Sequence, residues 1–283
     1  MKDTAVQNDL IFDVGMHRGE DSWIYLNKGF RVVAFEADPD LVQKCKEQFP
    51  DELASGQLTI VEGAIIEDTS QKTVTFFKNP VATIWGTVNA DWAARNERMG
   101  WESVEITVPV VDFVKAIEEY GVPHYLKIDI EGADTVCLDS LRHFQNKPNY
   151  LSIESSKTSI EEIDNELKIL TDLGYDAFKA VQQATHNKKP LPNPPLEGTK
   201  QVDFIPQDSS GLFGRELQGE WKDLKGIRKE YEKIMWGYKT FGNDTFMRTN
   251  PLARPVWKAL QKIMGRPIPG WYDTHAKQSG YSE

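Results

Sequence analysis

The sequence is poor in cysteine and has fewer basic than acidic residues, and both features exclude classes of protein. Only two of the 283 residues are cysteine, Cys45 and Cys137, and neither has a CxxC partner. A disulfide framework and a zinc site of paired cysteines are therefore not indicated. Lys and Arg number 33 against 43 Asp and Glu, which gives a formal net charge of −10. This balance argues against a nucleic-acid or anionic-membrane binder, although it leaves room for a local basic patch.

Long apolar runs are missing as well. No stretch approaches the roughly 20 apolar residues that span a bilayer. The first segment, MKDTAVQNDLIF, lacks the basic and then apolar pattern of a signal peptide. We therefore expect a reduced, cytoplasmic protein with no membrane or nucleic-acid partner. The composition, 40% hydrophobic and 27% charged, suits one large domain or a domain with an appendage, and it leaves the oligomeric state open.

Short apolar segments alternate with helical patterns through the first two thirds of the chain. The strand-like segments are LIFDV, RVVAFEAD, LTIVEGA, TVTFF, VEITVPVV, YLKIDIEG, YLSIES and YDAFKAVQ. Helices are expected at about residues 21–28, 41–49, 113–120, 133–144 and 160–173. Continuous apolar strands that alternate with helices predict a doubly wound α/β fold, with a mostly parallel sheet covered on both faces.

The pattern changes near residue 184. A proline-rich stretch, THNKKPLPNPPLEG, predicts a loop, and QVDFIPQD at 201–208 is expected to add one more strand. Apolar residues at three- and four-residue steps then predict an amphipathic helix; they are Leu224, Ile227, Tyr231, Ile234 and Tyr238. The tail is expected to add a short helix and an aromatic loop. We therefore divide the chain into a core, 1–183, and an elaboration, 184–283, that packs on it as a lid.

Ligands of an open parallel sheet bind beyond the carboxyl ends of its strands, so the turns after the strands indicate the site. The first turn contains Asp13, Gly15 and Gly19. Glycine permits a tight turn and a close approach to a ligand, and the helix that follows offers free N–H groups. The G-x-x-x-G spacing, with His17 inside it, differs from the G-x-G-x-x-G of dinucleotide sites. An ordinary strand-to-helix turn is the alternative.

The second and third turns contain residues that suit a nucleoside. Glu36 follows the second strand about twenty residues after the first turn, where an acid accepts hydrogen bonds from both ribose hydroxyls. After the third strand, Gly63 and Ala64 would leave room for a flat adenine ring. A solvated acid and an ordinary turn are the respective alternatives.

Charged residues interrupt the apolar strand YLKIDIEG. Lys127, Asp129 and Glu131 alternate with isoleucines, and Glu154 ends the next strand near the same cleft. Charges inside an apolar strand are costly to desolvate and usually have a function. Asp129 and Glu131 could be a general base with an orienting partner, a metal pair or acceptors of ligand hydrogen bonds. A purely structural Lys–Asp pair is the alternative.

In order and spacing, FDVGMHRGEDSWIYL, VVAFEADPDLV, EGAI and YLKIDIEGAD resemble the FkbM-type S-adenosylmethionine-dependent O-methyltransferases. The resemblance covers about residues 10 to 180. It implies a class I methyltransferase fold, whose seven-stranded, mostly parallel sheet has its last hairpin strand antiparallel.

The resemblance also implies a site. S-adenosylmethionine would lie over strands one to four. Asp13, Gly15 and Gly19 would line its methionine and ribose side, Glu36 would hold the ribose hydroxyls, and Ala64 would flank the adenine. Most relatives have a small residue and then Asn after DVG, where this chain has Met16, His17 and Arg18. His17 could therefore contact the donor carboxylate or the acceptor.

The expected chemistry is an in-line transfer of a methyl group to a hydroxyl of a small molecule or sugar, assisted by a general base. The candidate bases are Asp129, Glu131, Glu154 and His275. His275 belongs to the stretch WYDTH, which could form an aromatic wall for the acceptor or anchor the tail. A divalent metal at these carboxylates is less favoured, because no third ligand is evident. An NAD-dependent oxidoreductase and a non-catalytic binding module remain alternatives.

Overall fold

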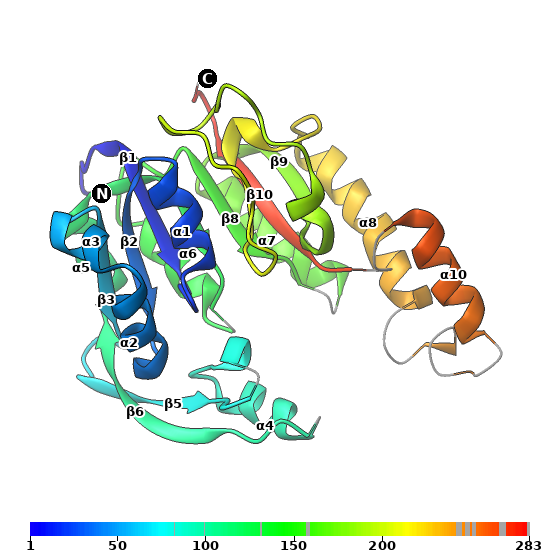
Figure 1. The fold of residues 1–283 in the computed structure, drawn as a ribbon, viewed down its shortest axis with the longest axis horizontal. Helices are drawn as coiled ribbons and strands as arrows, with labels where there is room; N and C mark the ends of the chain where they lie inside the picture. Colours follow the sequence, from blue (N-terminus) through cyan, green and yellow to red (C-terminus); the bar gives the residue numbers. More distant parts are fainter. Residues whose placement is uncertain are drawn as a thin grey trace.

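The computed structural model of the chain contains a seven-stranded sheet and a three-stranded sheet (Figure 1). It describes residues 1–81, 83–98, 100–130, 132–156, 159–241, 245–246, 250, 253–265 and 270–281, apart from the side chain of His186. The strands of the large sheet are β1 (Val6–Val14), β2 (Arg31–Glu36), β3 (Leu58–Glu62), β7 (Val122–Ile128), β8 (Tyr150–Glu154), β9 (Tyr175–Gln182) and β10 (Tyr272–Gln278).

The large sheet has the strand order β3-β2-β1-β7-β8-β10-β9. All neighbours are parallel except β10, which pairs antiparallel with both β8 and β9. The predicted α/β class, with seven mostly parallel strands and an antiparallel last strand, is therefore confirmed. Because the order reverses at β1 and β7, the carboxyl ends of these two strands form the crevice where such sheets bind ligands.

Two predicted strands belong to a different sheet. β5 (Thr73–Lys78) and β6 (Val104–Val111) pair antiparallel, and the short β4 (Ala64–Ile65) joins β6. This small sheet lies beyond the carboxyl ends of β1 and β2 in Figure 1, together with α4 (Ala90–Arg98), a helix that the sequence pattern did not predict. Along β6, buried residues are interspersed with solvent-accessible ones, as expected for a strand with one solvated face.

The seventh strand of the large sheet comes from the tail, which corrects two predictions. Residues 201–208 form a loop, in which Val202 and Ile205 are buried three positions apart rather than in strand alternation. The expected aromatic loop is instead β10, inserted between β8 and β9. The sequence YDTHAKQ does not show the apolar pattern of a strand, because polar residues of β10 are buried. One of them is paired: the Thr274 hydroxyl lies 2.5 Å from Tyr231 Oη and 2.8 Å from Ser155 Oγ.

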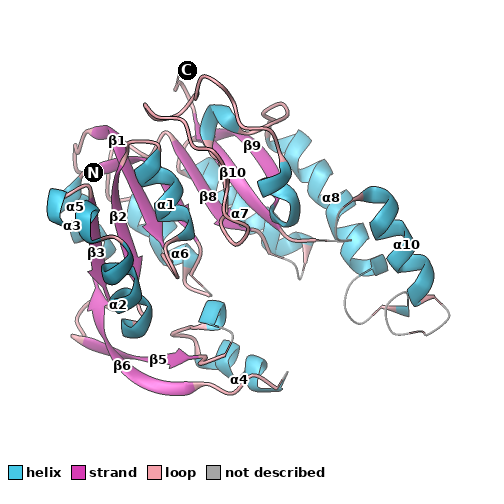
Figure 2. Cartoon of the chain, in the orientation of Figure 1, coloured by secondary structure: helices cyan, strands magenta, loops and turns pink. Residues whose placement is uncertain are grey.

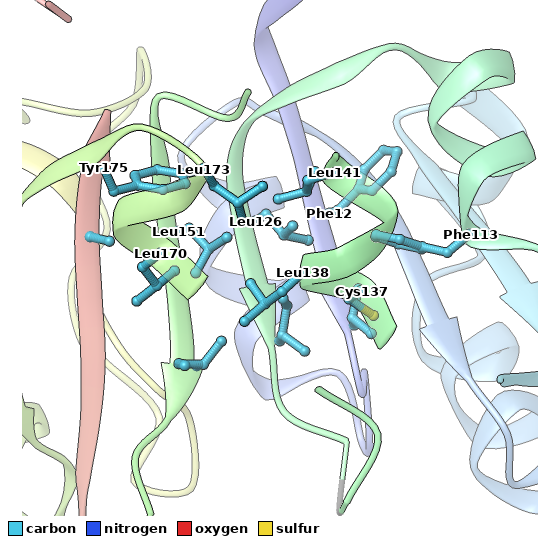
Figure 3. Packing of buried hydrophobic residues seen from close by; sticks show 14 of the residues in the cluster. Phe12, Phe113, Leu126, Cys137, Leu138, Leu141, Leu151, Leu170, Leu173 and Tyr175 are labelled. Carbon is cyan, nitrogen blue, oxygen red and sulfur yellow. The ribbon is translucent and has the colours of Figure 1, made fainter. Parts of the chain in front are cut away.

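Helices cover one face of the large sheet (Figure 2). They are α5 (Phe113–Tyr120), α6 (Asp134–Leu141), α7 (Ile160–Asp172) and α8 (Leu224–Phe241). In Figure 3, Leu138 and Leu141 of α6 pack with Leu126 and Leu151 of the sheet, and all four are buried. This core fixes β7 and β8 side by side and so fixes the two turns that follow them.

A loop covers much of the opposite face. This face carries the helices α1 (Glu20–Asn27), α2 (Pro39–Gln48) and α3 (Pro50–Ser55). Residues 191–217, which have no long helix, pack on the same face. Phe213 stacks on Tyr125, with ring centroids 4.2 Å apart and planes 3° apart. The buried Lys28 ammonium donates to Glu216 Oε1 at 2.8 Å.

Another helix, α10 (Arg254–Met264), lies at one end of the molecule. Among the described helices, none combines the length and apolarity needed to cross a bilayer.

Candidate active site

A cavity of about 680 Å³ opens at the carboxyl edge of the large sheet. Its walls are the turns after β1, β2, β7 and β8, together with β4 and the segment from Val81 to Val88. Residues 207–210, Gln183 and Asp273 complete it on the side of the tail. Its volume lies within the range of small-molecule sites. The cavity therefore connects the predicted nucleoside turns with the predicted carboxylates.

The turn after β1 is held close to its neighbours on both sides. The amides of Gly15 and Met16 both donate to the carbonyl of Phe35, at 3.0 and 2.9 Å. Gly15 has a φ of +85°, and a Cβ atom at this position would lie 2.0 Å from the carbonyl oxygen of Asp129. Gly19, the N-cap of α1, has a φ of +81°. Gly15 lines the cavity. Gly19 does not, contrary to expectation: a Cβ atom there would lie 2.5 Å from the ring of Phe49, so this glycine permits close packing of α1 on its neighbour.

Glu36 is buried at the end of β2 and joins the turns around it. Its Oε2 accepts the backbone N–H of His17 and its Oε1 accepts that of Asp38, each at 2.8 Å. Burial raises the pKa of this carboxyl, while the two amide hydrogen bonds oppose the shift. A carboxylate has about four lone-pair sites, so two remain for hydroxyl donors from the cavity.

His17 connects the same turn to the roof of the cavity. Its φ of +53° is left-handed, which is uncommon for a residue other than glycine. Its ring Nε2 lies 2.8 Å from the hydroxyl of Thr83, within the Val81–Val88 segment. His17 therefore lines the cavity, as expected of a donor-side residue, and also contacts the segment that covers it.

The predicted adenine turn is narrow. Gly63 has a φ of +138°, and a Cβ atom there would lie 2.6 Å from the carbonyl oxygen of Pro109. Its amide donates to the carbonyl of Glu36 at 2.9 Å. Ala64 and Ile65 line the cavity beside it, and both are buried. These small or apolar residues form a slot that suits a flat ring.

Lys127 organises a buried ionic network beneath the first turn. Its Nζ donates to the carbonyl of Gly15 at 2.8 Å and lies 3.2 Å from Asp13 Oδ1, 3.5 Å from Asp21 Oδ2 and 3.8 Å from Asp129 Oδ2. Burial raises the pKa of Asp21 to about 6, although Lys127 opposes the shift. Asp13 is fully buried and accepts the hydroxyl of Ser22 at 2.7 Å. It supports the turn from below and does not line the cavity, contrary to expectation.

Two of the predicted catalytic carboxylates meet at the far end of the cavity. Asp129 follows β7 and is about half exposed, and Glu154 ends β8 directly opposite Asp273 of β10. Asp273 is buried and accepts the side-chain amide of Gln183 at 2.7 Å. Burial raises the pKa of Asp273 well above its ordinary value, and Asp129 and Glu154 raise it further. Glu131, the third predicted carboxylate, lies outside the described residues.

His275 occupies a different place from the one expected of a catalytic residue. Its side chain is buried within β10 and does not line the cavity. Its ring is nearly parallel to that of Tyr125, with centroids 6.3 Å apart. Burial lowers the pKa of the imidazole to about 3. The placement supports the alternative that WYDTH anchors the tail, although Trp271 and Asp273 of the same stretch do line the cavity.

Sequence reasoning missed Asp21, Gln183 and the Val81–Val88 segment as parts of the site. Asp21 has a detectable signal, because it is an acid in the first turn of the helix after the glycine turn. Its Oδ1 accepts the amide of Ser210 at 2.8 Å, which fixes the tail loop against the cavity. Gln183 and Val81–Val88 have no motif in the sequence. Within the described part of the chain, no three His, Cys, Asp or Glu residues are grouped to hold a metal ion.

A model of the Methyltransferase FkbM domain matches residues 13–177, more than half of the chain. The protein belongs to the FkbM methyltransferase family. Among curated proteins, no significant match is found. A similar solved structure is the methyltransferase FkbM from Methylobacillus flagellatus KT, with 19% identity and a TM-score of 0.35, over 59% of this chain and 38% of that one.

Two further similar structures have lower identity. An O-methyltransferase from Bacillus cereus, in complex with SAH, has 13% identity and a TM-score of 0.35, over 62% of this chain and 67% of that chain. Fibrillarin from Aeropyrum pernix, with natively bound S-adenosyl-L-methionine, has 12% identity and a TM-score of 0.36, over 62% and 61% of the two chains.

S-adenosylmethionine is the cofactor of this methyltransferase family, and the residues present fit it. Glu36 has lone pairs free to accept two ribose hydroxyls after accepting two amides. Because Gly15 and Gly63 have no Cβ atom, the backbone can pack closely at both turns of the cavity. A Cβ atom at either position would collide with a backbone carbonyl oxygen. The cavity is also large enough for a second, smaller molecule beside the nucleoside.

Proposed function

We propose that this FkbM-family methyltransferase transfers the methyl group of S-adenosylmethionine to a hydroxyl of a small molecule or sugar. One observation carries the proposal: a single cavity joins Gly15, Glu36 and Ala64 at one end to Asp129 and Glu154 at the other. The donor would occupy the first group of residues, and the acceptor would lie against the second. The turn after β1 contacts residues of both groups.

In the proposed complex, Glu36 accepts the ribose hydroxyls and the Gly63–Ala64 turn flanks the adenine. The backbone of Gly15 lines the methionine side, and His17 lies at the same edge. The donor supplies an electrophilic methyl group on a positively charged sulfur. The protein's main contribution is then to hold the acceptor oxygen in line with that methyl group and to exclude water.

Asp129 is the proposed general base. A hydroxyl is a weak nucleophile at neutral pH, and a carboxylate within hydrogen-bond reach removes its proton as the C–O bond forms. When bound, the donor would supply the methyl group and leave as S-adenosylhomocysteine with the sulfur electron pair, so the acceptor would become a methyl ether and Asp129 would hold the proton. The Nζ atom of Lys127 lies 3.8 Å from Asp129 Oδ2. Glu154 would accept a second hydroxyl and orient the acceptor.

The residues after 183 would form part of the acceptor cover. Asp208, Ser209 and Ser210 line the cavity, and the amide of Ser210 is held by Asp21. Trp271, which is partly exposed at the rim, offers an apolar surface for a ring. This cover would set which acceptor enters.

Calorimetric titration with S-adenosylmethionine, S-adenosylhomocysteine and NAD tests the proposal first. We expect micromolar binding of both sulfur nucleosides and none of NAD. Binding of NAD alone would instead favour an oxidoreductase. If no nucleoside binds, and mass spectrometry finds none co-purified, the donor assignment is wrong. A methyl-transfer screen of sugars and phenols, scored by S-adenosylhomocysteine release, then tests the acceptor class.

A further inference from the structure

The helix α10 is basic along one side and has no buried residue. In RPVWKALQKIM, the residues Arg254, Lys258 and Lys262 recur at four-residue steps, which places them in one stripe. Between Thr245 and Tyr272 the sequence has five basic residues and no acidic one, in a chain whose net charge is −10. The positive charge is therefore concentrated in this part of an otherwise acidic protein.

Apolar side chains on another side of α10 face solvent. Val256 and Ile263, two turns apart on the same side, are 56% and 81% exposed. Met264 at the end of the helix and Trp236 on α8 are exposed as well. The apolar stripe of an amphipathic helix normally packs on the core, as Ile227, Tyr231 and Met235 of α8 do. In Figure 1, α8 and α10 project together from the end of the molecule.

We propose that α10 binds the surface of an anionic lipid bilayer. On α10, the apolar residues Val256, Ile263 and Met264 lie on one side, and the basic residues Arg254, Lys258 and Lys262 lie on another side. A helix with this division lies in the plane of the bilayer interface, with apolar side chains among the acyl chains and Lys or Arg at the headgroups.

The local positive charge favours an anionic lipid bilayer as the partner of α10, which has no acidic residue of its own. An anionic lipid surface attracts each Lys or Arg and improves binding by about fivefold per residue. The overall charge of −10 predicts no membrane binding, but attraction within one Debye length depends on the local charge.

The proposal concerns the surface of α10 and uses no residue of the cavity. The proposal itself does not depend on the identity of the acceptor.

Vesicle flotation with the full chain tests the proposal. The probes are vesicles of phosphatidylcholine and vesicles with about 30 mol% phosphatidylserine added, at about 0.1 M salt. We expect the protein to float only with the anionic vesicles and to be released at about 1 M salt. The double variant Lys258→Glu and Lys262→Glu should weaken binding by roughly 25-fold or more.

Two further variants make the outcome specific. Val256→Ser with Ile263→Ser removes exposed apolar groups without changing charge, and should weaken binding at least several-fold. Lys44→Glu with Lys72→Glu makes the same charge change at exposed sites outside this segment, and should bind as the wild type does. The proposal is overturned if the wild type does not float, if both lysine pairs have equal effects, or if the serine variant dissolves a dimer without changing flotation.

Discussion

The carboxylate of Glu36 accepts the backbone N–H of His17 at 2.8 Å, across 19 residues of sequence. Its other oxygen accepts the amide of Asp38. One side chain therefore holds the turns after β1 and β2 as a unit, at the place where a nucleoside ribose is proposed to bind. The same atoms that would bind the donor also order the loops around it.

Replacing Glu36 by Ala should weaken S-adenosylmethionine binding by about 1.5–3 kcal/mol, because charge-assisted hydrogen bonds to the ribose are lost. Calorimetry with S-adenosylmethionine measures the change. Glu36→Gln is the matched control, since it keeps one acceptor and the side-chain shape, and it should lose less affinity than the Ala variant. Unchanged affinity in Glu36→Ala would move the ribose contact to another residue.

Asp129→Asn should leave donor affinity within a few-fold but reduce turnover by about 10²–10⁴-fold, since the amide cannot take the hydroxyl proton. The measurement compares calorimetric donor binding with the rate of methyl transfer to an acceptor found by screening. Asp176→Asn, at an exposed position outside the cavity, is the control and should retain the wild-type rate. Full activity of the Asp129 variant would assign the base elsewhere.

Gly15→Ala should destabilise the fold strongly, because the new Cβ atom would lie 2.0 Å from the backbone oxygen of Asp129. Gly56 is a control with similar strain and no collision: its φ is +74°, and nothing lies within 4 Å of the position that an added Cβ atom would occupy. Gly56→Ala should cost about 1–2 kcal/mol of unfolding free energy, from the left-handed backbone alone. Urea unfolding should show a clearly larger loss for Gly15→Ala, and equal losses would contradict the close approach.

Lys28→Met should cost about 3–5 kcal/mol of stability, because it leaves the buried Glu216 carboxylate without its counter-ion. The exposed pair of Lys46 and Glu62 provides the comparison. Lys46→Met should change stability by only about 0–1 kcal/mol. If urea unfolding gives similar values for both variants, the loop that carries Glu216 does not depend on this ion pair for its docking.

The stability should also fall as pH rises between about 4.5 and 8, because of Glu166 of α7. Burial raises the pKa of this carboxyl to about 8, from an ordinary value of 4.5. The unfolded chain releases the proton near pH 4.5 and the folded chain only near pH 8, so stability decreases as pH rises between these values. Glu166→Gln should remove this decrease, whereas the exposed Glu161→Gln should retain it. Unfolding at about pH 5 and about pH 9 measures the slope, and a parallel decrease in Glu166→Gln would contradict this account.

The sequence by itself determined the nucleoside end of the site. β1, β2 and β7 are continuous apolar strands, so their periodicity and the turns that end them are local features. Of the residues proposed for that end, Gly15 directly follows β1, Glu36 ends β2, and Ala64 stands two residues after the end of β3. Their meeting at one edge then follows from the parallel arrangement, which alternating strands and helices predict.

Only the tertiary structure decided the rest of the cavity and the last strand. β10 is stabilised by hydrogen bonds of Thr274 and Asp273 with side chains distant in sequence, so its polar sequence has no strand periodicity. Asp13 has a sequence position typical of a ligand contact, yet Lys127 and Ser22 bury it beneath the turn. Local pattern specifies elements and the turns at their ends, whereas long-range polar pairing decides which side chains reach the cavity.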